Sequence, residues 1–375
     1  MSSEEMPLLQ NEVLQSSGKS TTDTVPGSGV QGTAGWSRPQ NIGHRGYKGA
    51  YPENTMAAFQ GAVAAGADGL ETDLHLSRDG VVVLSHDPTL KRCFGVDARI
   101  ADCDWSYLST LQTVQEPRQG MPRLVDLLEW LVRREVELES EPDHAVAAAV
   151  WLLLDIKTND DPERLLPAVA RTIASVPLPG GDVKGWKKRI VVGAWNENYI
   201  RHARLHLPGH PLAYIGFSLL YARRFLSDDF ADVRYFNLAQ LTLVGPLGAR
   251  FRHAIRERGR CLLVWTVNEP RWMAWSARKG VDGIITDEIA RLKGVLDQFG
   301  DGPKKAAEVE GEREEGKWEG QAGGIVATLP HPSVRLYVGA MFWQVAAALL
   351  TILLWYPLNT RGGKGKGGAP LPVKA

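Results

Sequence analysis

The sequence predicts an α/β fold in which eight parallel strands, each followed by a helix, close into a TIM (β/α)8 barrel. Apolar runs of strand length, such as residues 151–157 (WLLLDIK) and 261–268 (CLLVWTVN), alternate with segments that have the apolar spacing of helices. Strands that are buried on both faces have such continuous runs. The predicted strands begin near Asn41, Gly69, Trp151, Arg189, Pro211, Arg234, Cys261 and Val281.

The first predicted unit joins a short strand to a helix. An apolar entry at residues 41–43 precedes His44 and Arg45, so these two polar residues lie where the strand ends. The sequence PENT then opens a helix, for which Asn54 or Thr55 can be the N-cap. Glu53 can cap this helix or orient a ligand, and capping is the favoured role.

The second predicted strand, residues 69–76, carries two acids. Side chains alternate along a strand, so Glu71, Asp73 and His75 share one face. Two acids on one face repel each other, and a structural strand rarely keeps them without a compensating cation. A hard divalent metal with oxygen ligands, Mg²⁺ or Ca²⁺, is the expected compensation, and a solvated edge strand is the alternative interpretation.

The segment after the second strand is predicted to leave the barrel. Arg78, Asp79 and Gly80 form a turn signal, and a tight turn cannot join neighbouring parallel strands. Residues 81–86, the last of which is His86, are therefore expected to form a hairpin with the second strand. Residues 88–120 continue as an irregular excursion, so an insertion covers about residues 78–120.

The rest of the barrel alternates helix and strand, and its strands end in polar or aromatic residues. The sixth strand, residues 234–238, is predicted to be short and weak. Asp155 and Lys157 end the third strand, and Trp265 and Asn268 end the seventh. Active residues of such barrels lie at the carboxyl ends of strands, so these residues are expected at one mouth with those of the first two strands. Helices are expected over residues 124–131, 161–175, 199–205, 219–225, 249–258, 271–278 and 289–299.

The composition narrows the class of protein. The 43 basic residues balance the 43 acidic ones, so no charge excess argues for a nucleic-acid partner. The cysteines, Cys93, Cys103 and Cys261, show no metal-binding pair. Cys93 and Cys103 can pair geometrically, but free thiols in a reducing compartment are expected.

Four segments flank the barrel, which is predicted over residues 41–300. Residues 1–40 are rich in Ser, Gly, Thr and Gln and are expected to be a disordered arm without a secretory signal. Residues 301–332 are a charged linker, and residues 358–375 are a basic, Gly-rich tail. Between them, residues 336–356 carry no charge.

The uncharged run predicts a transmembrane or membrane-anchor helix over residues 333–357. As a helix it is about 30 Å long, roughly the thickness of a bilayer core. A buried core helix is the alternative, but the run follows a complete barrel and a linker. Insertion after synthesis is expected, with the barrel on the cytosolic side. The endoplasmic reticulum, the mitochondrion and the lipid droplet are not distinguished.

The motifs of residues 41–87 also carry a family resemblance. The order HRG, PENT, GAD, ETD and HD resembles the glycerophosphodiester phosphodiesterases, and the resemblance extends over residues 41–298. Within that family the chain looks most similar to fungal phosphatidylglycerol phospholipases C, which have a hydrophobic tail. The resemblance implies a TIM barrel with an inserted segment over its mouth. It implies that Glu71, Asp73 and Asp155 are metal ligands, the third being commonly Glu, and that Trp265 walls the glycerol side.

Phosphodiester cleavage needs charge neutralisation on the non-bridging oxygens, a base for the nucleophile and an acid for the leaving alkoxide. His44 and His86 are expected to share the acid and base roles, because imidazole exchanges protons near neutral pH. Arg45, through its fork, and Lys157 are expected to bind the phosphate. The nucleophile is either water or a glycerol hydroxyl, and the second route gives a cyclic phosphate. The sequence leaves both routes open.

Three functions are compatible with these features. The first is a membrane-tethered, metal-dependent phosphodiesterase that cleaves a phospholipid headgroup, with phosphatidylglycerol favoured and diacylglycerol and glycerol phosphate as products. The second acts on soluble deacylated diesters. The third is a catalytically inactive barrel that serves as a membrane-bound binding module. The presence of His44, His86, Glu71 and Asp73 together argues against the third.

Overall fold

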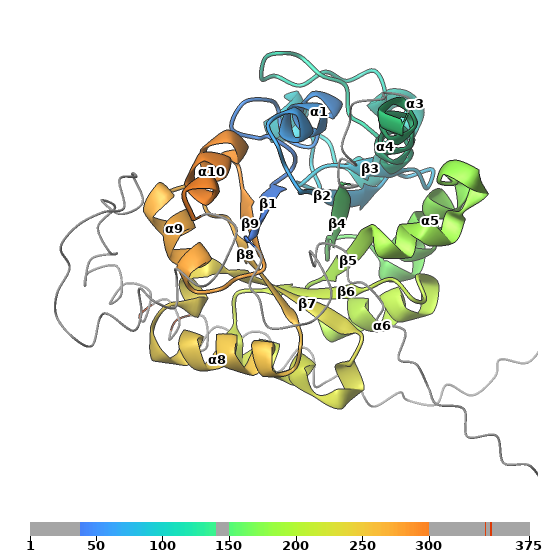
Figure 1. Cartoon of the computed structure of the whole chain (residues 1–375). Helices are drawn as coiled ribbons and strands as arrows, with labels where there is room; N and C mark the ends of the chain where they lie inside the picture. The colour runs from blue at the N-terminus through green and yellow to red at the C-terminus, as the bar shows by residue number, and fades with distance from the viewer. Residues whose placement is uncertain (1–37, 140–149, 300–341, 343–345, 347–375) are drawn as a thin grey trace, which may run out of the picture.

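The computed structural model describes residues 38–139 and 150–299, together with Phe342 and Ala346. Its centre is a barrel of parallel strands in the order β1-β9-β8-β7-β6-β5-β4-β2, which closes because β1 also pairs with β2 (Figure 1). The predicted TIM-like barrel is therefore confirmed. The barrel strands are β1 (Gln40–Gly43), β2 (Gly69–Leu76), β4 (Trp151–Ile156), β5 (Ile190–Ala194), β6 (Leu212–Gly216), β7 (Val233–Ala239), β8 (Cys261–Trp265) and β9 (Gly283–Thr286).

One strand differs from its prediction. β7 has seven residues and pairs with a strand on each side, so the prediction of a short, weak sixth strand was wrong. Its ladder with β6 reaches Leu238, and its ladder with β8 reaches Ala239. The strand forms although it carries the polar Asn237, which is buried within it. The weak local preference is thus overridden by tertiary pairing.

Helices cover the outside of the barrel, as Figure 1 shows. Thr55 is the N-cap of the first one, because its hydroxyl accepts a hydrogen bond from the Ala58 backbone. α8 begins four residues before the predicted position 249. The helices around the barrel are α1 (Met56–Ala64), α4 (Leu124–Glu139), α5 (Pro162–Ser175), α6 (Glu197–His206), α7 (Leu219–Ala222), α8 (Gly245–Glu257), α9 (Pro270–Arg278) and α10 (Ile289–Leu296). Short 3₁₀ helices are η2 (Pro179–Gly181), η3 (Val183–Lys188), η4 (Arg223–Leu226), η5 (Asp228–Phe230), η6 (Gln240–Leu243) and η7 (Asp297–Phe299).

The apolar core has two layers, one on each side of the strands. The larger layer packs the helices against the outside of the barrel. The smaller layer fills the barrel interior and has one or two side chains from most strands, because only alternate residues of a strand face inward. Its buried members are Ile42, Trp151, Leu153, Val191, Ala213, Tyr235, Leu263 and Ile285.

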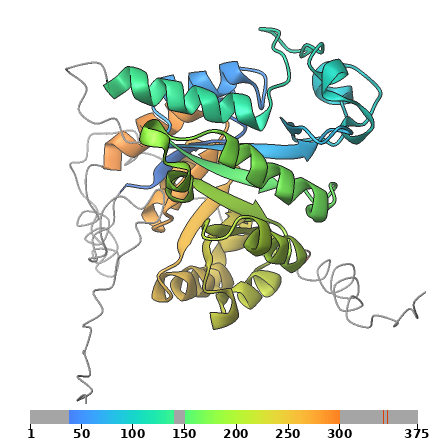
Figure 2. The same ribbon diagram turned by 90° about the vertical axis from the view of Figure 1, so that its right-hand side faces the viewer.

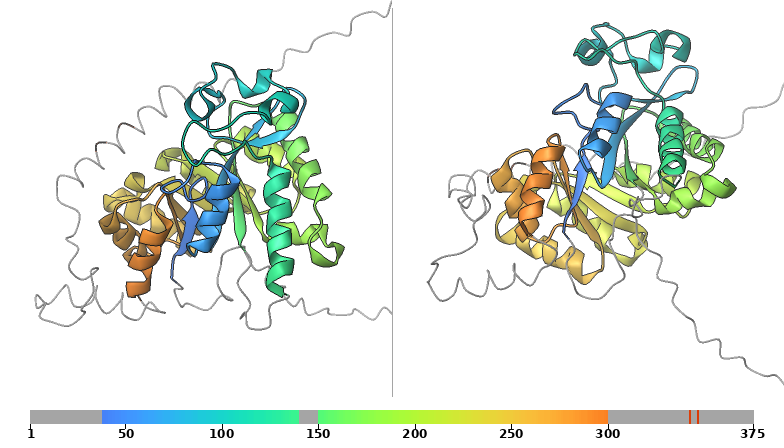
Figure 3. Two further views of the ribbon diagram at one scale, coloured as in Figure 1. Left: turned by 90° about the horizontal axis from the view of Figure 1, so that it is seen from above. Right: turned by 45° about the horizontal axis from the view of Figure 1, so that its top comes forward.

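The insertion begins with the predicted hairpin. β3 (Val82–Leu84) pairs antiparallel with the end of β2, outside the parallel barrel. It is followed by α2 (Lys91–Phe94), η1 (Ile100–Asp102) and α3 (Trp105–Leu108). Figure 2 and Figure 3 show this segment at the carboxyl end of β2. The insertion has a small core of its own, which consists of Val83, Leu90, Ile100, Leu108 and Met121.

Several predictions concern residues that the structure does not describe. The arm was predicted over residues 1–40; its residues 1–37 lie outside the described residues, whereas Gln40 already begins β1. The linker, the anchor segment at 333–357 and the tail also lie outside them, apart from Phe342 and Ala346. Within the described part of the chain, none of the helices combines the length and the apolar character needed to cross a membrane. The three cysteines are free thiols, as predicted.

Candidate active site

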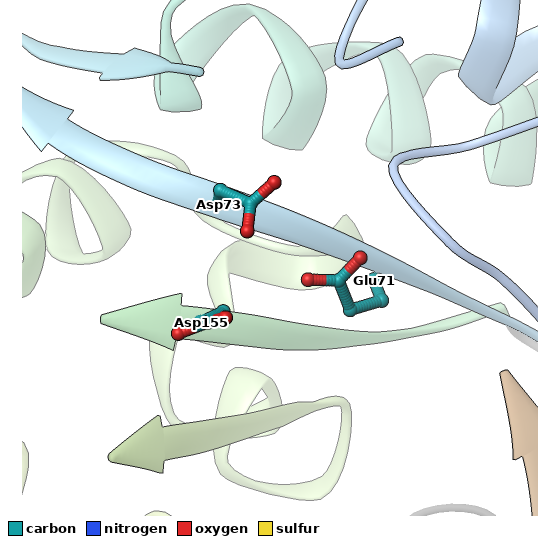
Figure 4. A group of neighbouring side chains, drawn as sticks. All are labelled: Glu71, Asp73 and Asp155. Carbon is teal, nitrogen blue, oxygen red and sulfur yellow. The ribbon is translucent and has the colours of Figure 1, made fainter. Parts of the chain in front are cut away.

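Three carboxylates meet at the carboxyl end of the barrel interior. Glu71 and Asp73 lie on β2, and Asp155 lies on the neighbouring β4, where it pairs in register with Asp73. One oxygen from each of the three lies within 4.8 Å of the others, and all three side chains are buried (Figure 4). The alternation that puts Trp151 and Leu153 into the barrel also directs Asp155 inward.

Two cations compensate part of this charge. Lys157 Nζ lies 2.7 Å from both Asp73 Oδ1 and Asp155 Oδ2, and Arg45 Nε lies 3.3 Å from Asp73 Oδ2. Burial alone acts to raise the pKa of Asp73, but Lys157 and Arg45 outweigh it and hold this pKa well below its usual range. Burial acts to lower the pKa of Lys157, and the surrounding carboxylates reverse this and raise it.

Glu71 is the least compensated of the three carboxylates. Burial, together with the charges of Asp73 and Asp155, raises the pKa of Glu71 well above its ordinary value. Three buried carboxylates therefore surround two cations, and their oxygens are the ligands that hard divalent metals prefer. These residues fit a bound divalent metal, in agreement with the prediction from the sequence.

His44 follows β1 and is oriented by an acid that the sequence did not indicate. Its Nδ1 lies 2.7 Å from Asp287 Oδ1, just after β9. Asn268 fixes Asp287, since its Nδ2 donates to Asp287 Oδ2 at 2.8 Å and its Oδ1 accepts from the Asp287 backbone at 2.9 Å. Because a carboxylate only accepts, Nδ1 of His44 carries the proton of this hydrogen bond, and Nε2 is the nitrogen that remains for proton transfer.

His86 follows β3 and is held at two points. Its Nδ1 lies 2.8 Å from Asp87 Oδ1, and its backbone carbonyl lies 3.2 Å from His75 Nε2. His75 in turn contacts Asp160 through Nδ1, so it supports His86 instead of joining the carboxylate cluster. Burial, assisted by the charges of Lys157 and Arg45, lowers the pKa of His86, although the Asp73 carboxylate acts in the opposite direction.

The loop after β1 brings Arg45 to the cluster. Its backbone is left-handed, with φ of 54°, and its amide donates to Glu71 Oε2 at 2.9 Å. Its Nη1 donates to Glu53 Oε1 at 2.9 Å, so Glu53 orients Arg45 and the predicted capping role was wrong. Asn54, also left-handed, donates from Nδ2 to Asp73 Oδ2 at 2.8 Å and accepts from the Thr72 hydroxyl.

Two tryptophans line one side of the cluster. Trp265, at the end of β8, has its ring 5.7 Å from that of Trp195 in an edge arrangement. Trp195 directly follows β5, and its Nε1 donates to Asp155 Oδ1 at 2.7 Å. The ammonium of Lys157 lies 5.6 Å from the centre of the Trp195 ring. The sequence signal for Trp195 was its position at a strand end, the same position that Asp155 and Lys157 have on β4.

The fold and the site agree with a family-level match. The model of the glycerophosphoryl diester phosphodiesterase family matches residues 44–291, which is more than half of the chain. The chain therefore belongs to this family. It is a phosphoric diester hydrolase that acts on glycerophosphodiesters, and its acidic cluster can hold the metal on which the family depends.

Individual relatives extend this finding. A glycerophosphodiester phosphodiesterase of Caldanaerobacter subterraneus is 24% identical over 265 residues, which cover 67% of this chain and 95% of the relative. A human lysophospholipase D is 51% identical over 69 residues, which are 18% of this chain and 22% of the relative. The structure of an Oleispira antarctica phosphodiesterase in complex with sn-glycerol-3-phosphate has a TM-score of 0.58 and 21% identity, and covers 69% of this chain and 97% of that one.

Proposed function

We propose that the chain cleaves the headgroup diester of a glycerophospholipid, with phosphatidylglycerol as the substrate and diacylglycerol and glycerol 3-phosphate as the products. Its site residues are His44, His86, Arg45, Lys157, Trp265 and the three carboxylates. The observation that carries the chemistry is the convergence of Glu71, Asp73 and Asp155 beside Lys157 and Arg45. The cluster contains more carboxylates than basic side chains, which suits a bound divalent cation, and its two basic side chains suit the substrate phosphate.

The proposed roles follow from the geometry of each side chain. Mg²⁺ or Ca²⁺, when held by Glu71, Asp73 and Asp155, supplies a Lewis acid for the phosphate oxygens. Arg45 and Lys157 bind the non-bridging oxygens. In the structure the side chains of Arg45 and Lys157 are paired with carboxylates, and the substrate phosphate replaces some of these carboxylate contacts when it binds.

The two histidines supply the proton transfers. His44, with Nδ1 held by Asp287, presents Nε2, while the His86 ring is held through Nδ1 by Asp87. One ring, in its neutral form, accepts the proton of the nucleophile, and the other, in its protonated form, donates a proton to the leaving oxygen as the P–O bond breaks, so the leaving group departs as an alcohol. Water serves as the nucleophile directly, or a substrate hydroxyl forms a cyclic phosphate that water then opens.

Two features support a lipid substrate over the soluble alternative. Residues 336–356 form a run without charge, which suits anchoring of the barrel to a membrane. The human relative that matches over 69 residues is named as a lysophospholipase D. The aromatic side chains of Trp195 and Trp265 suit a wall for the glycerol part of either substrate.

The decisive assay compares phosphatidylglycerol in mixed micelles with glycerophosphoglycerol in solution, at equal metal concentration. The proposal expects higher kcat/KM on the lipid and equimolar release of diacylglycerol and glycerol phosphate. If only glycerophosphoglycerol is turned over and phosphatidylglycerol is not, the result contradicts the lipid proposal and favours the soluble diester. Absence of turnover on every diester favours the inactive binding module.

We also propose that residues 333–357 anchor the chain with the barrel on the cytosolic side. Deletion from residue 333 onward is expected to release the enzyme from washed membranes while activity on a detergent-dispersed diester persists, because all proposed site residues precede residue 298. Activity on intact membranes is expected to fall, since tethering raises the local concentration. Retention of the truncated chain after a carbonate wash contradicts this anchoring.

A further inference from the structure

Arg92 lies on α2 in the insertion, outside the residues that the sequence indicated for the site. Its guanidinium donates from all three nitrogens. Nε lies 2.7 Å from Asp87 Oδ2, while Nη1 and Nη2 lie 2.8 and 2.7 Å from the two oxygens of Glu53. The bidentate contact with Glu53 fixes the direction of the carboxylate as well as its distance.

Each of the two acceptors holds a functional residue with its other contacts. Glu53 Oε1 also accepts from Arg45 Nη1 at 2.9 Å, and Asp87 Oδ1 lies 2.8 Å from His86 Nδ1. One guanidinium is therefore connected through Glu53 to the proposed phosphate ligand and through Asp87 to a proposed acid or base. The two connections begin on different segments of the chain, the β1 loop and the residues after β3.

The backbone that carries Arg92 is well anchored. Leu90, two residues earlier, is fully buried in the insertion's own core, and its amide donates to the Ala98 carbonyl at 2.9 Å. The carbonyl of Cys93 accepts from the Val114 amide at 2.8 Å. Arg92 thus contacts the site from a fixed position. Through it, the insertion is hydrogen-bonded to the carboxylates of Glu53 and Asp87.

An ordinary surface ion pair contributes little, and the Arg92 side chain is 47% exposed. Its partner Glu53, however, is only 7% exposed and lies between two guanidiniums. The same insertion contains a contrasting pair, Arg78 with Asp104, whose side chains are 61% and 38% exposed. Within the described part of the chain, the Asp104 side chain hydrogen-bonds to Arg78 and to none of the proposed site residues, so Arg78 provides a matched control.

We propose that Arg92 is a positioning residue that sets the orientation of Arg45 and His86 at once, through Glu53 and Asp87. The insertion thereby completes the site. This inference rests on the roles proposed above for Arg45 and His86.

The test measures kcat and KM on glycerophosphoglycerol for Arg92→Gln, Arg92→Lys and the control Arg78→Gln. Arg92→Gln is expected to lower kcat/KM by about 10- to 100-fold, the size of loss that misplaced catalytic groups produce. Arg92→Lys is expected to recover little, because an ammonium cannot replace a fork that contacts two carboxylates. The control is expected to stay within about twofold of the unmodified enzyme.

A triple variant separates a positioning role from a role in folding alone. If Arg92 acts through Glu53 and Asp87, its loss adds little to Glu53→Gln combined with Asp87→Asn, since coupled residues are not additive. A role in folding alone lowers the melting temperature but leaves kcat and KM of the folded enzyme unchanged. If Arg92→Gln does not fold, Arg92→Lys carries the same comparison.

Two results overturn the inference. One is a kcat/KM of folded Arg92→Gln that lies within twofold of the unmodified enzyme. The other is a fully additive loss when Arg92→Gln is combined with Glu53→Gln and Asp87→Asn. His86→Ala is measured in parallel: if it loses activity while the Arg92 variants keep it, only the positioning role fails. Full activity of His86→Ala instead refutes the proposed function on which the inference rests.

Discussion

The two ends of the barrel interior are built from the same strands yet have opposite energetics. β4 has Trp151 and Leu153 in the apolar layer at its amino end and Asp155 in the charged cluster at its carboxyl end. All three side chains face inward. Burial of a leucine contributes about 1.5–3 kcal/mol of stability, whereas a buried carboxylate is costly unless it is paired. One end therefore stabilises the fold, and the other uses part of that stability for chemistry.

The compensating contacts show the same division. Lys157, Arg45, Trp195 and Asn54 all donate to or pair with carboxylates at the carboxyl end. The buried side chains of the apolar layer are uncharged, so this layer needs no ion pairs. The difference predicts that substitutions at the carboxyl end change activity far more than stability, and that the reverse holds at the amino end.

The largest expected effect is on catalysis at the carboxyl end. His44→Ala and His86→Ala are each expected to lower kcat by roughly two to four orders of magnitude, the usual contribution of a positioned acid or base. Melting temperatures are expected to change little, because neither ring belongs to the apolar layers. His253→Ala, at an exposed position on α8, is the control. Near-normal turnover in a purified variant removes that histidine from the mechanism.

At the amino end the expected effect is on stability. Leu153→Ala is expected to lower the free energy of unfolding by about 2–5 kcal/mol, because it leaves a cavity in the closed interior. Denaturant unfolding measures this change, with Leu205→Ala, an exposed position on α6, as the control. The kcat of the folded variant is expected to persist. A loss of kcat that matches the histidine variants breaks the proposed division between the two ends.

The smallest expected effect concerns the stability cost of the charged end. The pKa of Glu71 is raised by burial and by its neighbouring carboxylates, so the folded, metal-free chain holds this proton more tightly than the unfolded chain does. Stability therefore falls as pH rises above the ordinary glutamate pKa of about 4.3. Glu71→Gln is expected to raise the melting temperature of the chelator-treated enzyme near neutral pH, and this gain shrinks toward that lower pH.

The control for this prediction is Glu129→Gln, at an exposed position on α4, which is expected to leave melting unchanged at either pH. Activity of Glu71→Gln is expected to be lost at the same time. A variant that melts lower than the unmodified, metal-free enzyme at neutral pH contradicts the assignment of Glu71 as the uncompensated carboxylate.

Local patterns in the sequence were sufficient for the barrel and for most of the carboxylate cluster. Continuous apolar runs mark strands buried on both faces, and the alternation of Glu71 and Asp73 places both on one side of β2. The fold rule for strand ends then adds Asp155 and Lys157. These inferences succeed because they depend on neighbours in the chain and on a regular repeat.

The sequence by itself thus determined the barrel, its hairpin insertion and the acids that face its interior, because strand periodicity and burial act locally. Only the tertiary structure decided which groups orient the functional residues. Asp287 reaches His44 across 243 positions, and Arg92 reaches Glu53 across 39. Barrel closure and the packing of the insertion create these contacts. The local sequence suggested a cap for Glu53, whereas its contacts with two distant guanidiniums make it a support for Arg45.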